Sequence, residues 1–107
     1  MYQVGHFIGG KHVAGTSGRK QPIYNPATGE VQGEVSLASA DELNAAVENA
    51  KAAQAKWAAT NPQRRARVFM KFVQLLNDNM NELAEILSRE HGKTIEDAKG
   101  DIVRGLE

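Results

Sequence analysis

The spacing of apolar residues changes from a period of two to a period near 3.6 at Ser39. Before Ser39, short apolar runs are separated by turns that contain glycine and proline, a pattern typical of β-strands. After it, apolar residues recur every three or four positions, as they do on one face of a helix. The sequence therefore predicts strands and turns over residues 1–38 and helices over residues 39–107.

Two β-hairpins are expected in the first part of the chain. Gly9 and Gly10 lie between Phe7-Ile8 and His12-Val13 and can supply the positive φ angles of a tight turn. In the second hairpin, a strand over residues 21–24 enters a turn over residues 25–29, and a strand over residues 31–37 leaves it. Pro22 lacks an N–H for the strand ladder, so its strand should lie at a sheet edge.

The first two of four expected helices are marked by their opening residues. Ser39 and Glu42 have the spacing of a capping box, in which each side chain accepts from the other residue's amide. Pro62 suits the first turn of the second helix, where its missing N–H would have no helical partner. The apolar stripes comprise Leu43, Ala46, Val47, Ala50, Ala53 and Trp57 in the first helix, and Ala66, Phe69, Phe72, Val73 and Leu76 in the second.

The last two helices have similar signals. Asn79 and Glu82 repeat the capping spacing, Gly92 is placed to end the third helix, and Thr94 begins the fourth. The inward side carries Leu83, Ala84, Ile86 and Leu87 in the third helix, and one side of the fourth carries Ile95, Ala98, Ile102 and Leu106. The fourth pattern runs to Glu107 without a helix-ending glycine or proline. We therefore expect a piece of a larger α/β enzyme.

Composition and charge narrow the classes of function. The 107 residues carry 13 basic and 13 acidic side chains, so no electrostatic argument favours a nucleic acid or an anionic membrane. The basic cluster of Arg64, Arg65 and Arg67 lacks the aromatic platforms of a nucleic-acid site. No run approaches the about 20 apolar residues of a membrane span, and the first residues do not resemble a signal peptide. A cytoplasmic protein without nucleic-acid or membrane partners is expected.

The chain contains no cysteine, so it can hold no disulfide, thiolate metal site or thiol nucleophile. Any reaction through a thioester must use a cysteine outside these residues, and no catalytic residue is assigned here. His6, His12 and His91 lack the spacing of metal ligands, so no metal site is predicted. The glycines at 9–10 and 15–18 match no phosphate-binding motif, and no cofactor-binding residue is assigned.

Arg104 is the one candidate ligand-binding residue. It falls opposite the apolar side of the fourth helix, between Gly100 and Gly105. A mid-helix glycine costs about 1 kcal/mol relative to alanine and often marks a close approach by another group. Two interpretations stay open: a solvated arginine that pairs with Asp101 or with the exposed backbone of Gly100, or a contact between the planar guanidinium of Arg104 and a ligand carboxylate.

An ordered series of segments resembles the aldehyde dehydrogenases. In chain order they are Asn25-Pro26-Ala27-Thr28-Gly29-Glu30-Val31, Ala46-Val47 with Ala53 and Trp57, Arg64-Arg65-Ala66-Arg67-Val68, Leu75-Leu76, Glu82-Leu83-Ala84 and Glu90-His91-Gly92-Lys93-Thr94. The last stretch, Gly100-Asp101-Ile102-Val103-Arg104-Gly105-Leu106-Glu107, is similar to one in the CoA-acylating methylmalonate-semialdehyde dehydrogenases. The resemblance covers nearly the whole chain.

The resemblance implies an α/β, Rossmann-type enzyme of about 500 residues with NAD-binding, catalytic and oligomerisation domains. Residues 1–38 would be an N-terminal β-hairpin region and residues 39–107 the helical lead-in of the NAD-binding domain. A cysteine further along would attack a semialdehyde, hydride would pass to NAD, and CoA would take the acyl group with loss of CO₂. A homo-oligomer, as a tetramer, is also implied.

In the methylmalonate-semialdehyde dehydrogenases, the arginine that matches Arg104 is expected to help hold the substrate carboxylate, aided by a second arginine much further along the chain. The resemblance therefore favours the ligand-binding interpretation of Arg104. Two alternatives stay open for the chain: a segment of a non-acylating aldehyde or semialdehyde dehydrogenase, and a stand-alone helical interaction module.

Overall fold

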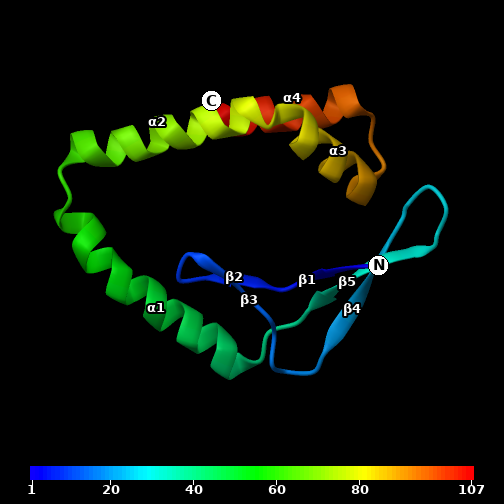
Figure 1. Ribbon diagram of the computed structural model, residues 1–107, viewed down its shortest axis with the longest axis horizontal. Helices are drawn as coiled ribbons and strands as arrows, with labels where there is room; N and C mark the ends of the chain where they lie inside the picture. Colours follow the sequence, from blue (N-terminus) through cyan, green and yellow to red (C-terminus); the bar gives the residue numbers. More distant parts are fainter. The chain divides into compact units, whose positions relative to one another are not determined.

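The computed structural model describes all 107 residues, which form five strands and four helices in two compact units (Figure 1). The first unit contains Met1–Tyr24 and Val31–Thr60, so the strands and the first helix belong together. The second contains Asn25–Glu30 and Asn61–Glu107, so the turn between two strands is grouped with the last three helices.

The first unit contains a three-stranded sheet in the order β1 (Tyr2–Val4), β5 (Val31–Ser36), β4 (Lys20–Tyr24). Strands β4 and β5 are antiparallel, which confirms the second predicted hairpin and the edge position of β4. Strand β1 runs parallel to β5 and was not predicted, because three residues without a turn signal carry no clear pattern. A side chain on Gly33 would come within 2.8 Å of the Tyr2 carbonyl oxygen, so glycine permits this pairing.

A second sheet in this unit confirms the first predicted hairpin. Strands β2 (His6–Ile8) and β3 (Lys11–Val13) are antiparallel and are joined by Gly9 and Gly10, whose φ angles are 64° and 78°. This is the left-handed region that favours glycine. The hairpin lies against the first helix, because a Cβ on Gly9 would be 3.5 Å from the side-chain nitrogen of Asn49.

Helix α1 (Ala40–Ala59) begins at the predicted capping box. The Glu42 amide donates to Ser39 Oγ, and the Ser39 amide donates to Glu42 Oε1, both at 3.1 Å. These two bonds satisfy amides that the helix itself leaves without acceptors. The apolar stripe of α1 is largely exposed, with Leu43 and Val47 among its exposed residues.

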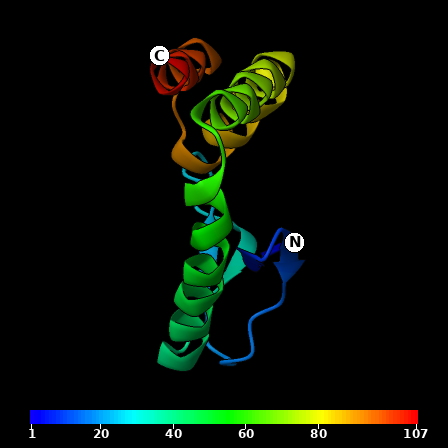
Figure 2. The same ribbon diagram turned by 90° about the vertical axis from the view of Figure 1, so that its left-hand side faces the viewer.

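The second unit is built on α2 (Pro62–Asp78), α3 (Met80–His91) and α4 (Ile95–Leu106). Helices α3 and α4 carry the two fully buried hydrophobic residues, Ala84 and Ala98. In Figure 2, α4 (orange to red) is seen separately from α2 (yellow-green). Gly92 ends α3 with a φ of 91°, as predicted, and Thr94 caps α4 by accepting from the Asp97 amide at 3.2 Å.

Two expectations for α3 are wrong. Asn79 occupies the N-cap position of α3, but its side chain makes no capping hydrogen bond there, because its amide donates to the Leu75 carbonyl oxygen at 2.8 Å. The reason is the short connection, because Asn79 alone separates α2 from α3. Its side chain hydrogen-bonds to the end of α2 and is not available to the start of α3. Ile86, expected inward, is 43% exposed.

Large apolar side chains are exposed along α2 as well as α1. They include Val68, Phe69, Met70 and Phe72. The fully buried hydrophobic core of the chain consists of two alanines, which is small for a domain of this length. None of the helices combines the length and the apolar character that a membrane crossing requires.

Candidate functional site

Arg104 lies in the last turn of α4 and points largely into solvent, with 72% of its side chain exposed. Its Nη2 donates a charged hydrogen bond to Oδ1 of Asp101, one helical turn earlier. The ion pair, one of the two interpretations that the sequence left open, is thus formed, and most of the Arg104 side chain stays accessible. The role of Arg104 in binding a substrate stays a prediction.

Asp101 binds a second cation through its other carboxylate oxygen. Lys93, in the connection between α3 and α4, places Nζ on Asp101 Oδ2, and its side chain is only 21% exposed. The Lys93 carbonyl oxygen accepts from Ser88 Oγ at 2.7 Å, which fixes the connection to α3. Hydrogen bonds from Lys93 and then from Arg104 lower the pKa of Asp101 below its ordinary value, so the carboxylate is charged at neutral pH.

Gly100 leaves space beside the guanidinium, and Gly105, the next residue after Arg104, has open space around it. A Cβ added to Gly100 would find Arg104 Nη1 at 4.0 Å as its nearest neighbour, and a Cβ added to Gly105 would meet nothing within 4 Å. Neither glycine has a positive φ angle, so backbone conformation does not require them. An exposed guanidinium with an open edge can form two parallel hydrogen bonds with a carboxylate. The local geometry therefore fits the ligand class that the sequence favours.

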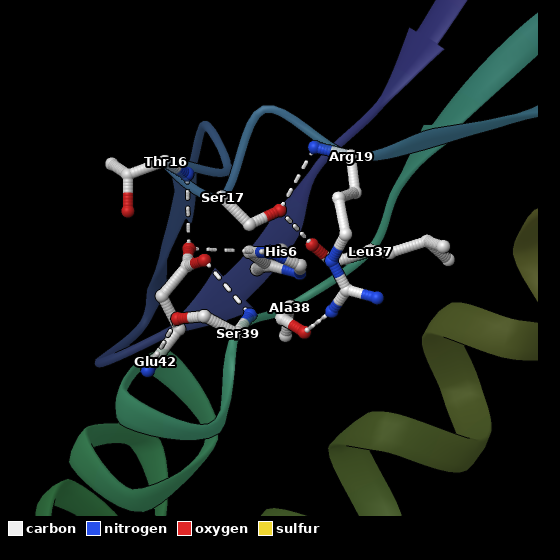
Figure 3. Close-up of polar contacts among 8 residues, drawn as sticks. All are labelled: His6, Thr16, Ser17, Arg19, Leu37, Ala38, Ser39 and Glu42. Carbon is white, nitrogen blue, oxygen red and sulfur yellow. Dashed lines mark hydrogen bonds and ion pairs between the residues drawn. The ribbon is translucent and has the colours of Figure 1, made fainter.

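A second polar cluster joins the loop before β4 to the start of α1 (Figure 3). Glu42 Oε2 accepts from the Thr16 backbone amide at 3.1 Å and lies 3.7 Å from His6 Nε2. Hydrogen bonds from the Ser39 and Thr16 amides are the main causes that lower the pKa of Glu42. The His6 and Glu42 side chains are mostly buried, at 18% and 16% exposed. The cluster therefore fixes a charged carboxylate inside the first unit.

Further contacts fasten the same loop to the connection between β5 and α1. Ser17 Oγ donates to the Leu37 carbonyl oxygen and accepts from the Arg19 amide at 3.1 Å. The Arg19 guanidinium donates to the Ala38 carbonyl oxygen at 2.8 Å (Figure 3). The side chains of Ser17 and Arg19 contact backbone groups only, which is typical of a structural junction. The sequence showed Glu42 as a cap, but its contacts with His6 and Thr16 come from distant positions that periodicity does not address.

The histidines and the basic cluster, which the sequence also raised as candidates, form no binding site in the structure. The His12 ring packs edge-on against Phe7, with ring centroids 5.3 Å apart, and His91 is the last residue of α3. No three histidine, aspartate or glutamate side chains come together as metal ligands would. Arg64 and Arg65 lie in the first turn of α2. Of the candidate residues taken from the sequence, Arg104 is therefore the one that we assign to ligand binding.

Residues 12–107 match the model of the aldehyde dehydrogenase family. The chain belongs to this family, as the ordered motifs predicted. Its fold is that of the N-terminal segment of an aldehyde dehydrogenase, which confirms the predicted fold class.

Curated relatives are malonate- and methylmalonate-semialdehyde dehydrogenases. The chain is 47% identical over 102 residues to malonate-semialdehyde dehydrogenase 3 of Geobacillus kaustophilus, and the match covers 95% of this chain and 21% of that protein. It is 43% identical over 101 residues to the human acylating, mitochondrial methylmalonate-semialdehyde/malonate-semialdehyde dehydrogenase, covering 94% and 19%. The chain thus spans about one fifth of the length of these relatives.

A solved structure of a protein in this family is more similar to the chain than these curated relatives are. A Sinorhizobium meliloti protein, described as a methylmalonate-semialdehyde dehydrogenase and crystallised with NAD, shares 83% identity with the chain at a TM-score of 0.97. The match covers 99% of this chain and 22% of that one. The chain therefore superimposes on a segment of a larger enzyme of this family.

Proposed function

We propose that this chain is the N-terminal part of an NAD-dependent, CoA-acylating methylmalonate- or malonate-semialdehyde dehydrogenase. The observation that carries the proposal is the 83% identity, over 99% of the chain, with a protein described as a methylmalonate-semialdehyde dehydrogenase and crystallised with NAD. The name of the human relative, which includes acylating, supports CoA as the acyl acceptor. The reaction converts semialdehyde, CoA and NAD⁺ into acyl-CoA, CO₂ and NADH.

The proposal assigns the covalent chemistry to residues outside this chain. A thioester route needs a thiolate nucleophile, and the chain contains no cysteine. NAD, when bound, accepts the hydride. The glycine turns of this chain do not fit a dinucleotide phosphate, because Gly10 leads into β3 and Gly18 into β4 rather than into a helix N-terminus. The segment alone is therefore expected to be inactive.

The contribution of this chain to substrate selection is assigned to Arg104. In a carboxylated semialdehyde, the negative charge lies on a carbon other than the aldehyde carbon. A cation placed near the aldehyde carbon, where it can reach the carboxylate, therefore favours this substrate over uncharged aldehydes. Arg104 is exposed, lies between Gly100 and Gly105 in the chain and carries a planar guanidinium with several N–H donors. These features support its assignment to the substrate carboxylate.

The remaining four fifths of such an enzyme would cover apolar surface that is exposed here. The stripes of α1 and α2 carry large apolar side chains in solvent, among them Leu43, Phe69 and Phe72. Exposed patches of this kind mark surfaces that bind other protein segments. This supports a polypeptide that continues beyond the segment, whereas a stand-alone interaction module would need another use for the same surface.

The test is an assay of the full-length polypeptide that carries this segment. Malonate semialdehyde and methylmalonate semialdehyde should each drive NAD reduction that depends on CoA, with acyl-CoA and CO₂ as products measured by mass spectrometry. The isolated 107-residue chain, assayed alongside, should show none of this activity. A free acid formed without CoA would favour the non-acylating alternative, and no NAD reduction with either semialdehyde would contradict the proposal.

A further inference from the structure

Asp101 connects two cations that come from different parts of the second unit. One carboxylate oxygen accepts from Nζ of Lys93, in the connection before α4, and the other accepts from Nη2 of Arg104, in the same helix. The Asp101 side chain is 34% exposed and that of Lys93 less. The carboxylate is therefore held in place by a residue outside the α4 turn that it shares with Arg104.

This anchoring distinguishes the pair from an ordinary surface ion pair. An exposed pair at spacing i, i+3 stabilises weakly because two long side chains must both be ordered. Glu96 and Lys99, on the same helix at the same spacing, are of this ordinary kind, with 3.7 Å between their charged atoms and Glu96 87% exposed. At Asp101, Lys93 has already ordered the acceptor, so only the Arg104 side chain has to be fixed.

The direction in which Arg104 is held leaves an edge of its guanidinium free. Nη2 is turned to Asp101, while Nη1 lies beside Gly100, where a Cβ would be 4.0 Å away. The cluster of Lys93, Asp101 and Arg104 carries two positive charges and one negative charge, so it keeps a net charge of +1. The free edge can therefore still attract and bind an anionic group.

We propose that Asp101, anchored by Lys93, is a positioning residue that orders the Arg104 guanidinium for the carboxylate of the substrate. The inference rests on the proposed function, in which Arg104 binds that carboxylate. Ordering the arginine before substrate arrives lowers the conformational entropy that binding would otherwise lose. Asp101 touches neither substrate nor cofactor in this arrangement, and acts through Arg104.

The experiment uses the full-length enzyme and compares carboxylated semialdehyde with propanal. The variants are Asp101→Ala, Asp101→Asn, which keeps an acceptor oxygen, Arg104→Leu, and Glu96→Ala as the control from the neighbouring ion pair. We expect Asp101→Ala to raise KM for the semialdehyde by about 2- to 5-fold, the size of a surface ion-pair effect. Its kcat, and its kinetics with propanal, should be unchanged. Asp101→Asn should show a smaller rise, and Glu96→Ala none.

Each outcome separates the inference from the proposed function. If Arg104→Leu raises KM for the semialdehyde selectively but neither Asp101 variant does, the positioning role is wrong and the proposed function stands. If Arg104→Leu affects both aldehydes equally, the assignment of Arg104 itself is wrong. A lower KM for the semialdehyde in Asp101→Ala would mean that Asp101 competes with the substrate carboxylate for Arg104. Equal losses of activity on both aldehydes would mean that Asp101 has a structural role. Either result overturns the inference. Should Asp101→Ala fail to fold, Asp101→Asn decides.

Discussion

The carboxylate of Glu42, in the first turn of α1, accepts the backbone amide of Thr16, 26 residues earlier in the chain, at 3.1 Å. The same side chain accepts the Ser39 amide and so also starts the helix. One glutamate thus caps α1 and fixes the loop that leads to β4. The stability of this part of the chain depends on its negative charge.

Glu42→Gln should release the loop at Thr16. The amide keeps the size of the carboxylate but loses its charge and one acceptor oxygen, so the hydrogen bonds from Thr16 and Ser39 cannot both persist. We expect a lower hydrogen-exchange protection factor for the Thr16 amide, measured by NMR. Glu48→Gln, an exposed glutamate of the same helix that pairs with Lys51, is the matched control and should leave this amide unchanged. Equal protection in the Glu42 variant would contradict the assignment.

Acid should weaken the same junction in the unmodified chain. The folded pKa of Glu42 lies below its ordinary value of 4.5, so the charged form binds its partners more tightly than the protonated form does. The stabilisation is complete above the ordinary pKa and is lost as pH falls through the lowered folded pKa. Protection of the Thr16 amide, corrected for intrinsic exchange, should fall in this acid range. Glu42→Gln should show a flat profile there, and a matching fall in that variant would assign the titration to another group.

Alanine substitutions at Gly105 and Gly29 should change the free energy of unfolding in opposite directions. Gly105 lies in α4 without a positive φ angle, and an added Cβ meets nothing within 4 Å, so Gly105→Ala should stabilise the isolated chain by about 0.5–1 kcal/mol. Gly29 has a φ of 77°, so Gly29→Ala should destabilise it by about 1 kcal/mol. Chemical denaturation followed by circular dichroism measures both. Two changes of the same sign would contradict the backbone argument.

The exposed apolar face of α2 should cause the isolated chain to self-associate. Phe69 and Phe72, which both belong to the apolar stripe of this helix, are more than half exposed. We expect concentration-dependent association in sedimentation velocity, which Phe72→Ser reduces by removing apolar surface. Gln63→Ser, on the same helix and also exposed, is the control that should change nothing. A monomeric chain with a cooperative thermal transition would instead favour the stand-alone module.

Arg104→Leu in the full-length enzyme should impair carboxylated semialdehydes selectively. A hydrogen bond to a charged group contributes about 1.5–3 kcal/mol, so KM should rise by about 10- to 100-fold while propanal is spared. Lys99→Leu, an ion-paired cation of the same helix, is the control and should leave both substrates unaffected. Steady-state kinetics with the two aldehydes measures the difference. An equal loss for both would remove Arg104 from the substrate site.

Local signals in the sequence predicted most of the secondary structure because the responsible interactions span few residues. The capping box at Ser39, the glycine turn of the first hairpin and the left-handed Gly92 each depend on neighbours within about four positions. The failures have a different cause. Strand β1 requires a partner about 30 positions away in β5, and Asn79 had to serve one of two helices that both adjoin it.

The sequence by itself determined the family, the missing thiol and Arg104 as the candidate contact, since motifs and composition depend on residue identity alone. The tertiary structure decided how these residues are arranged. It brought Lys93 to the Asp101 carboxylate oxygen that Arg104 does not contact. It also gave Glu42, a helix cap, a second hydrogen bond to the distant loop at Thr16. Such arrangements depend on the path of the chain between elements, which brings charged groups together at separations that no local pattern encodes.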